Sequence, residues 1–378
     1  MEEDIPSLLE ALHPGDSQNY GEQLANLSLT WKYLESLPPN ARQVRIFYRK
    51  MVLRDLETPK GSLCLVHGFG EHSGRFMNVA VEFALQGFEV HLGDLRHLGC
   101  SGGARAGHDL LELQKDVNLI LQQAREDLPC FIWGHSMGGL LVTTVLINNP
   151  SLKVKAIITA PLYRNPALKV NWFKIQALEF LQPLLEMQVM NSYICPSSIT
   201  RDDSYLKQMF EDRKMLPFLG PKMGLSMLHH MKHLWQAVRL FKHPVVFFHG
   251  KADSLTCHKA TIEVYERCTS QDKTLKMLEG VYHEPHHDYG REEFFSTVKN
   301  WMETRLQGSL GKVGSLKVGY PGLPKPSKAK YLVLVLLLVY FVVAYKVRIT
   351  NHEKIWKSLS KLALKLGWPI YYLLKVLV

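Results

Sequence analysis

Phe131-Ile132-Trp133-Gly134-His135-Ser136-Met137-Gly138-Gly139-Leu140 is the stretch from which the fold of this chain of 378 residues is predicted. The apolar run at 131–133 predicts a buried strand, and the apolar spacing of 140–147 predicts a helix that ends before Pro150. The Gly-x-Ser-x-Gly between them is typical of a sharp turn that makes a serine hydroxyl project from the end of a strand. A glycine-rich turn with an ordinary serine is the alternative, but the strand–turn–helix order favours a nucleophile at Ser136.

Strand and helix signals alternate along most of the chain. Short apolar runs predict strands at 45–53, 62–66, 88–92, 131–133, 154–159, 245–248 and 275–278. Helical spacing recurs at 76–85, 110–128, 140–147, 260–268 and 292–304. This order predicts right-handed crossovers and a mostly parallel sheet, so the fold class is α/β.

The alternation stops between residues 162 and 243, where only helical patterns occur. We interpret 162–243 as a helical cap inserted into an α/β core formed by 41–161 and 244–306. Residues 1–40 are weakly patterned and are expected to be an N-terminal extension. Glycine, proline and lysine are frequent at 307–330, which predicts a flexible linker. A hydrophobic basic tail follows at 331–378.

A serine hydroxyl needs a base and an orienting carboxylate to become a nucleophile, and in this arrangement they follow in the order Ser, acid, His. Asp253 comes directly after the strand at 245–248, and His283 comes directly after the strand at 275–278. Both are therefore expected at the sheet edge that carries Ser136. His286 and His287 are rivals of His283, but we expect them to be surface or loop histidines.

The oxyanion of an acyl-transfer reaction needs two backbone N–H donors. One is the amide after the nucleophile, which is Met137 here. The other comes from the loop after the first core strand, His67-Gly68-Phe69-Gly70, and by position it belongs to Phe69. An ordinary glycine-rich turn is the alternative reading of this loop.

His67-Gly68-Phe69-Gly70-Glu71-His72-Ser73-Gly74-Arg75 resembles the oxyanion segment of the monoacylglycerol lipase branch of the α/β-hydrolases, also called the serine aminopeptidase or hydrolase 4 group. Residues 134–139 match its nucleophile motif, and 280–284 resemble its catalytic histidine loop. The resemblance covers about residues 40–306. It implies an α/β-hydrolase fold and a serine ester hydrolase acting on monoacylglycerols or similar single-chain lipids. It implies that Ser136, Asp253 and His283 form the catalytic triad, and that the backbone amides of Phe69 and Met137 form the oxyanion hole.

One loop departs from the family pattern. The family usually has Asp-x-x-Gly-His-Gly-x-Ser after the second core strand, whereas this chain has Asp94-Leu95-Arg96-His97-Leu98-Gly99-Cys100-Ser101. The pair His97-Leu98 therefore replaces Gly-His. The histidine of that pair is not a member of the triad, so we expect the chemistry to survive the change.

The cap is strongly apolar over 170–190, and methionines recur there and beyond, at 187, 190, 209, 215, 223, 227 and 231. A cap core is the simpler explanation of any one of these residues. Together they are more apolar than a solvated helix can bury on itself, which favours an acyl-chain site under the cap.

The tail carries the positive charge. Residues 308–378 hold 12 Lys/Arg and one acid, so the net charge of +10 leaves −1 on 1–307. Residues 331–345 are uncharged and apolar, and lysines 354, 357, 361 and 365 fall on one helical face. This predicts insertion into a membrane, with a basic helix on anionic lipid. A buried helix followed by a solvated one is the alternative.

The composition excludes other classes of protein. A chain that is 46% apolar and 21% charged can bury a core, and a body of charge −1 argues against a nucleic-acid binder. The six cysteines form no zinc pattern, so no metal or organic cofactor is expected. The acidic N-terminus lacks an apolar leader, which predicts a catalytic domain in the cytosol, at a membrane.

Two alternative functions stay open. One is a lysophospholipase or acyltransferase with the same triad, and the other is a non-catalytic membrane-tethered module. The oligomeric state is not predicted.

Overall fold

The computed structural model describes residues 20–36, 44–103, 108–166, 175, 178–179, 190–191, 195–216 and 218–318. Nearly all of them belong to one compact unit, which comprises 1–169 and 186–322. The second unit, 170–185 and 323–378, contributes only residues 175, 178 and 179 to the described set. Everything that follows concerns the first unit.

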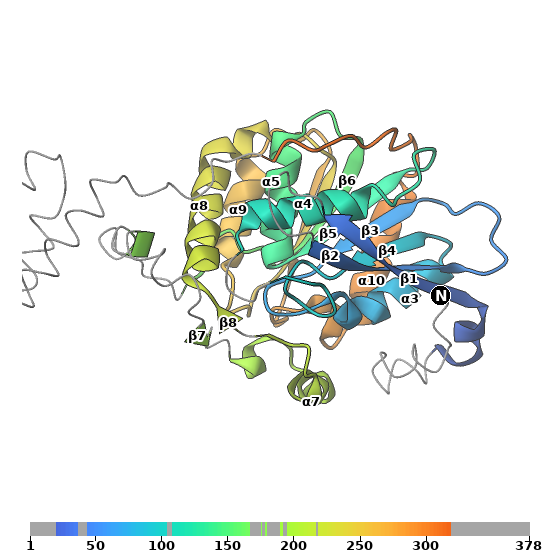
Figure 1. Cartoon of the computed structure of the whole chain (residues 1–378), viewed down its shortest axis with the longest axis horizontal. Coiled ribbons are helices and arrows are strands. Elements are labelled where there is room, and N and C mark those ends of the chain that lie inside the picture. Colours follow the sequence, from blue (N-terminus) through green and yellow to red (C-terminus); the bar gives the residue numbers. More distant parts are fainter. Residues whose placement is uncertain are drawn as a thin grey trace, which may run out of the picture. The chain divides into compact units, whose positions relative to one another are not determined.

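An eight-stranded sheet forms the centre of this unit, in the order β1-β2-β4-β3-β5-β6-β9-β10 (Figure 1). The strands are β1 (Leu27–Ser36), β2 (Val44–Leu53), β3 (Ser62–Val66), β4 (Glu89–Gly93), β5 (Cys130–His135), β6 (Val154–Thr159), β9 (Val245–Gly250) and β10 (Lys273–Leu278). β2 pairs antiparallel with β1 and β4, and the other pairs are parallel. The α/β fold class with a mostly parallel sheet is therefore confirmed.

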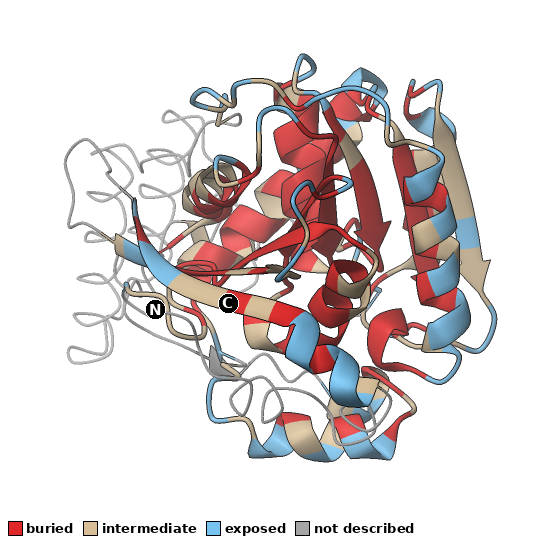
Figure 2. Ribbon diagram, turned by 90° about the vertical axis from the view of Figure 1, so that its right-hand side faces the viewer, coloured by how far each residue is buried: buried red, intermediate tan, exposed pale blue. Residues whose placement is uncertain are grey.

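Helices cover both faces of the sheet, and the alternation of side chains along β5 explains why. Cys130 and Ile132 point into one apolar core, whereas Phe131 and Trp133 point into the other. The first core includes α4 (Leu110–Leu121), α5 (Met137–Asn148), α8 (Pro221–Ala237) and α9 (His258–Arg267). The second includes α3 (Met77–Leu85) and α10 (Arg291–Glu303). Figure 2 shows the central strands buried almost throughout.

The register brings the carboxyl ends of the parallel strands to one level. Gly134 of β5 lies opposite Val66 of β3, and Thr159 of β6 lies opposite Phe248 of β9. The loops after these strands therefore meet at one edge of the sheet, which is where open α/β sheets place their sites.

Smaller elements complete the described residues. They are the 3-10 helices η1 (Gly21–Asn26), η2 (Ser73–Phe76), η4 (Pro196–Ser198), η5 (Val238–Leu240) and η6 (Pro285–His287), the helix α7 (Asp203–Glu211), and the short strands β7 (Met190–Asn191) and β8 (Phe218–Leu219).

Only part of the predicted cap, 162–243, is described, so its boundaries stay a prediction. Its last helix, α8, packs directly on the core. The Leu110 amide of α4 donates to Ser226 Oγ of α8 at 2.9 Å, and Met223, Met227 and Met231 are buried in the core beside α4 and α5. These three methionines are therefore buried core residues of the unit, which agrees with the simpler explanation given for each of them.

The predicted N-terminal extension contains a strand of the sheet. β1 pairs along its whole length with β2, from Leu27 opposite Leu53 to Ser36 opposite Val44. Three leucines of this strand are buried, at positions 27, 29 and 34. The α/β unit thus begins well before residue 41.

The first half of the predicted linker at 307–330 also differs from a free linker. Leu310 is buried, and its amide donates to the Leu128 carbonyl at 2.8 Å. The Lys317 amide donates to Asn149 Oδ1 at 2.8 Å. Residues 307–318 therefore run along the core, held by apolar contact and backbone hydrogen bonds. Residues 319–330 lie outside the described part of the chain.

A buried ion pair beside the sheet edge provides a test of this packing. Arg96 donates to both carboxylate oxygens of Asp116 on α4, the shortest contact being 2.6 Å, and both side chains are almost wholly buried. Asp116→Ala should lower the free energy of unfolding by about 3–5 kcal/mol, because it leaves a buried guanidinium without its carboxylate. Urea denaturation measures this change.

Asp127→Ala is the matched control, because Asp127 pairs with Arg125 on the exposed surface. It should leave the urea midpoint nearly unchanged. Equal losses in the two variants would contradict the packing described for Arg96.

Candidate active site

Ser136 stands at the junction of β5 and α5 in a strained conformation. Its φ is +54° and its ψ is −117°, and only His97 and Ala160 share a positive φ among the described non-glycine residues. The surrounding backbone compensates this strain. The Ser136 amide donates to the Thr159 carbonyl at 3.0 Å, and the Leu162 amide donates to the Ser136 carbonyl at 2.9 Å.

The two glycines of the motif allow α5 to approach the sheet closely. A Cβ on Gly138 would lie 2.3 Å from the Val66 carbonyl oxygen, and a Cβ on Gly134 would lie 2.5 Å from the Gly138 carbonyl oxygen. No larger residue fits at either position without moving the backbone. The glycines therefore set how near the helix N-terminus and Ser136 lie to β3 and its loop.

The structure brings the three predicted triad residues together. Ser136 Oγ lies 3.0 Å from His283 Nε2, and His283 Nδ1 lies 2.7 Å from Asp253 Oδ2. Asp253 follows β9 and His283 follows β10, so the parallel register carries both to the end of β5. The geometry is that of a nucleophile, a base and an orienting carboxylate.

Two residues that the sequence analysis missed hold Asp253 in place. Thr256 donates its hydroxyl to Asp253 Oδ2 at 2.8 Å and its amide to Asp253 Oδ1 at 3.0 Å. His249 Nε2 lies 3.2 Å from Asp253 Oδ2. His249 is the last but one residue of β9, and only the tertiary structure reveals its contact with Asp253.

Charge determines the protonation of the pair. Burial alone would raise the pKa of Asp253, but the charge of His283 and hydrogen bonds from His249 and His283 hold it well below its ordinary range. Burial alone would lower the pKa of His283, but the charge of Asp253 and their hydrogen bond raise it above its ordinary value. Asp253 therefore stays a carboxylate that favours the imidazolium over the neutral imidazole.

The predicted oxyanion donors lie beside this group on two elements. Met137 is the first residue of α5, so its amide has no acceptor within the helix. Phe69 follows β3 in a loop held by Glu71, whose carboxylate accepts from the Gly68 amide at 2.5 Å. A Cβ on Gly68 would lie 3.1 Å from Ser136 Cβ, so this loop runs directly past the serine.

Buried charges link the Phe69 loop to the His283 loop. Arg75 lies between two carboxylates, 2.6 Å from Glu284 Oε2 and 3.4 Å from Glu71 Oε2. Burial, followed by the charge of Glu284, raises the pKa of Glu71 to about 7. Glu284, which follows the predicted base, is thus connected through the Arg75 guanidinium to Glu71, which accepts from the Gly68 amide.

The expectation that His286 and His287 are surface or loop histidines is wrong. Both lie in η6 and are buried. His286 stacks on Phe76 with ring centroids 4.7 Å apart, and His287 Nδ1 lies 2.6 Å from Glu284 Oε2. Packing under the His283 loop explains their burial, and neither is a contact of Ser136.

Among the described residues, Glu284, His286 and His287 are also the one group whose ligand atoms lie close enough to share a metal ion. Arg75 already donates to the Glu284 carboxylate and brings a positive charge into the cluster. These three side chains are therefore better suited to pairing with one another and with Arg75 than to binding a metal cation.

The loop that departs from the family pattern is tied to the site by Asp94. Its carboxylate accepts from the Ser73 amide at 2.8 Å and from the Cys100 amide at 2.7 Å. His97, which replaces the family's glycine, has a φ of +71° and stacks on His108 at 3.8 Å. The chain thus has a left-handed backbone conformation at this position without a glycine, and the ring of the residue that adopts it stacks on His108.

A small apolar hollow of about 20 Å³ lies next to Phe69. Leu98, Leu216, Phe218 and Met223 line it, together with His97 and His108. The Leu216 amide donates to the Gly70 carbonyl at 2.7 Å, so this part of the cap is attached to the Phe69 loop. Most of the apolar segment 170–190 lies outside the described residues, and its predicted role stays a prediction.

Comparison with known proteins identifies relatives. Residues 57–290 match the Hydrolase_4 family, described as serine aminopeptidase, S33, and all five predicted site residues fall within that range. An uncharacterized abhydrolase domain-containing protein of Dictyostelium discoideum is 34% identical over 268 residues. That match covers 69% of this chain and only 28% of the Dictyostelium protein.

Two lipases are also similar. The monoglyceride lipase of Mus musculus is 27% identical over 259 residues, which cover 66% of this chain and 84% of the lipase. The crystal structure of the monoacylglycerol lipase of Paleococcus ferrophilus has a TM-score of 0.62 at 26% identity. That likeness covers 68% of this chain and 98% of the Paleococcus protein.

The contact between His283 and Asp253 can be tested by measuring the pKa of His283. Asp253→Asn should lower the pKa of His283 to below its ordinary value near 6.5, because the negative charge is lost while burial still disfavours the imidazolium. Imidazole resonances of histidine-labelled protein, followed by NMR against pH, measure the shift. Asp203→Asn, an exposed acid at the start of α7, is the control and should change nothing. An unaltered His283 pKa in Asp253→Asn would contradict the pairing.

Proposed function

Since the chain belongs to the serine aminopeptidase S33, or Hydrolase_4, family of α/β-hydrolases, we propose that it is a serine ester hydrolase of single-chain lipids. Its substrates are monoacylglycerols or similar esters, and its products are a free fatty acid and glycerol. The similarity to the lipases of Mus musculus and Paleococcus ferrophilus supports this substrate class. The observation that carries the proposal is the continuous line of contacts from Ser136 Oγ through His283 to Asp253.

The chemistry proceeds in two steps through an acyl-enzyme. Ser136 Oγ attacks the ester carbonyl while His283 Nε2 takes its proton, and His283 returns that proton to the departing glycerol oxygen. Asp253 orients His283 and stabilises the imidazolium. The amides of Phe69 and Met137 donate to the oxyanion. Water, deprotonated by His283, then attacks the acyl-enzyme and releases the fatty acid.

The apolar hollow beside Phe69 supports an acyl substrate. It opens next to the loop that carries one oxyanion donor and is lined mainly by aliphatic and aromatic side chains. Its volume of about 20 Å³ holds only about one water-sized group, so most of an acyl chain would lie beyond it, under the apolar cap predicted from the sequence. Each methylene group buried under that cap would stabilise the bound ester by about 0.8 kcal/mol, without any polar recognition. Long acyl chains are therefore expected to be cleaved better than acetyl esters.

Lysophospholipase or acyltransferase activity through the same triad is the second candidate. The observation that favours it is the charge of +11 on residues 308–378, which suits a phospholipid surface. Product analysis separates the candidates, because hydrolysis of monoacylglycerol yields glycerol, lysophospholipase action yields a glycerophosphodiester, and acyl transfer yields a new ester.

Membrane association through residues 331–378 is part of the proposal and rests on the sequence. Among the residues that the structure describes, no helix is both long enough and apolar enough to cross a bilayer. The tail itself lies outside those residues. Its apolar run and its basic face support contact with anionic lipid, and the position of the catalytic unit in the cytosol stays a prediction.

Replacing the nucleophile tests the catalytic proposal. Ser136→Ala should lower kcat for a long-chain monoacylglycerol by at least about 10³-fold and should abolish labelling by a fluorophosphonate probe. Ser151→Ala, at an exposed serine after α5, should behave as wild type. If folded wild-type protein resists the probe, the non-catalytic, membrane-tethered alternative is favoured instead.

Deleting the tail tests the membrane proposal. A chain ending at residue 318 keeps Leu310 and Lys317, which bind the core, and should no longer sediment with vesicles that contain anionic lipid. It should still hydrolyse a soluble ester, because the residues of the site are retained. Replacing lysines 354, 357, 361 and 365 with Gln in the full chain should weaken binding to anionic vesicles selectively. Continued sedimentation of the shortened chain would rule out the tail as the anchor.

A further inference from the structure

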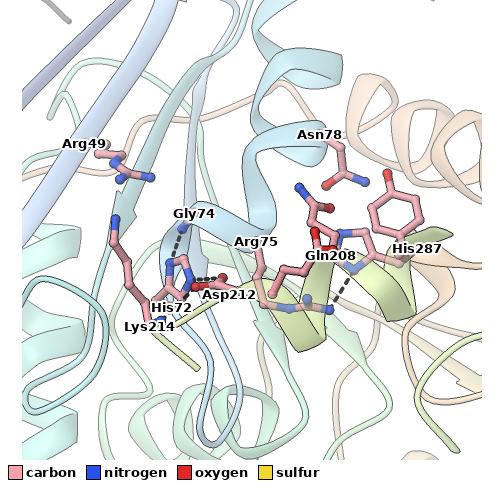
Figure 3. Close-up of a pocket in the computed structure, with 11 residues that line it drawn as sticks. Arg49, His72, Gly74, Arg75, Asn78, Gln208, Asp212, Lys214 and His287 are labelled. Carbon is pink, nitrogen blue, oxygen red and sulfur yellow. Dashed lines mark hydrogen bonds and ion pairs between the residues drawn. The ribbon is translucent and has the colours of Figure 1, made fainter. Parts of the chain in front are cut away.

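A pocket of about 300 Å³ lies at the junction of β2, η2 and α7, and none of the predicted triad or oxyanion residues lines it (Figure 3). Cationic side chains are prominent in its wall. Arg49 comes from β2, Arg75 from η2, and Lys214 from the turn after α7. These elements all belong to the compact unit described above.

Arg49 is a buried cation in this wall. Its side chain is on β2, the residue is only 8% exposed, and its guanidinium lies 4.9 Å from the centroid of the Phe47 ring. No described residue forms an ion pair or a side-chain hydrogen bond with it, and its Nε is completely buried without a partner. Burying an unpaired cation is costly, so this guanidinium needs an anion.

The other buried arginines among the described residues differ from Arg49, because each is paired with a carboxylate. Arg96 is paired with Asp116 at 2.6 Å, and Arg75 is paired with Glu284 at 2.6 Å. Both carboxylates belong to the chain itself. Among the described residues, Arg49 is therefore the buried arginine that has no carboxylate partner.

Lys214 adds a second cation to the same pocket. Its ammonium group has no partner among the described residues, and Figure 3 shows it extending toward the end of the pocket where Arg49 lies. The Gln208 side chain also lines the wall and offers an amide donor. Two cations from separate elements thus border one space.

Two carboxylates, Asp212 and Glu211, also line the pocket. Asp212 accepts from His72 Nε2 at 2.6 Å and from the Lys214 amide at 2.8 Å, so its carboxylate is already engaged. Glu211 is exposed at the end of α7, and no described residue pairs with its carboxylate. The lining side chains thus comprise three cations, with Arg75 the third, and two carboxylates, a formal charge of +1.

Gly74 keeps the space in front of Arg49 open. A Cβ at this position would lie 3.3 Å from Arg49 Nη1 and 2.7 Å from His72 Cε1. Any side chain there would stand against the guanidinium and fill part of the pocket. The glycine therefore leaves the Nη1 side of Arg49 accessible to a ligand.

We propose that this pocket binds a phosphate group, with Arg49 and Lys214 as its charged ligands. A phosphate monoester carries a charge of about −1.5 to −2 at pH 7, so it neutralises both cations, whereas a carboxylate would neutralise one. A guanidinium binds two phosphate oxygens at once, and a lysine supports a third as a point charge. The pocket is large enough to hold a group attached to the phosphate, such as glycerol.

Calorimetric titration of the full chain in the Ser136→Ala background tests the proposal, because binding is then measured without turnover. Inorganic phosphate and glycerol 3-phosphate should both bind. Arg49→Gln should weaken binding at least about 10-fold, and Lys214→Gln about 3-fold or more, since each removes a charged hydrogen-bond donor. The matched controls Arg45→Gln on β2 and Lys207→Gln on α7 alter exposed cations outside the pocket and should bind as the parent does.

Thermal unfolding gives a second measurement. Phosphate should raise the Tm of the parent and of both controls, because a ligand of the folded state stabilises it, and should not raise the Tm of Arg49→Gln. If Arg49→Gln does not fold, Lys214→Gln decides the matter, because Lys214 is exposed and its replacement does not disturb the core.

A short-chain lysophosphatidate, used below its micellar concentration, identifies the source of the phosphate. Binding at least about 10-fold tighter than glycerol 3-phosphate, still lost in Arg49→Gln, assigns the pocket to a lipid headgroup, and equal binding assigns it to soluble phosphates. The proposal is overturned if none of the three ligands binds folded protein, or if the variants at 49 and 214 bind as the controls do. These results do not depend on the proposed hydrolysis, whose failure would appear only in turnover by the Ser136 enzyme.

Discussion

The close approach of the α5 N-terminus to β3 is the constraint on which the candidate site depends. Gly138 packs against the Val66 carbonyl at a distance that excludes a Cβ, and Ser136 takes a positive φ just before it. The strain is tolerated because Thr159 and Leu162 of the next strand and its loop hydrogen-bond the Ser136 backbone. The hydroxyl is thereby held at the rim of the sheet, between the loop after β3 and the loop after β10.

Buried charge then fixes those loops relative to one another. Asp253 binds His283, and Arg75 joins Glu284 of the His283 loop to Glu71 of the Phe69 loop. A shift of one loop would therefore strain ion pairs that hold the other, since each charge is removed from water. The predicted base and one predicted oxyanion donor are thus positioned by a common network. Arg49, for which we propose a phosphate ligand, lies outside that network.

Much of the fold follows from local patterns, and the exceptions have physical causes. Parallel strands buried on both faces are continuous apolar runs, so β3, β5, β6 and β9 were predictable. β1 was missed although 27–33 alternates apolar and polar residues, because an antiparallel edge strand exposes part of its surface. The segment 307–318 has a linker's composition but is held by Leu310 and backbone hydrogen bonds, which composition does not encode.

The sequence by itself determined the order of strands and helices, the turn at Ser136, and the strand ends that carry Asp253 and His283, because each of these is written in a few neighbouring residues. Only the tertiary structure decided that His286 and His287 are buried, that Thr256 and His249 hold Asp253, and that Arg49 and Lys214 border one pocket. The reason is that such contacts join residues far apart in the chain. They depend on strand register and on the packing of loops, and no local pattern specifies either one.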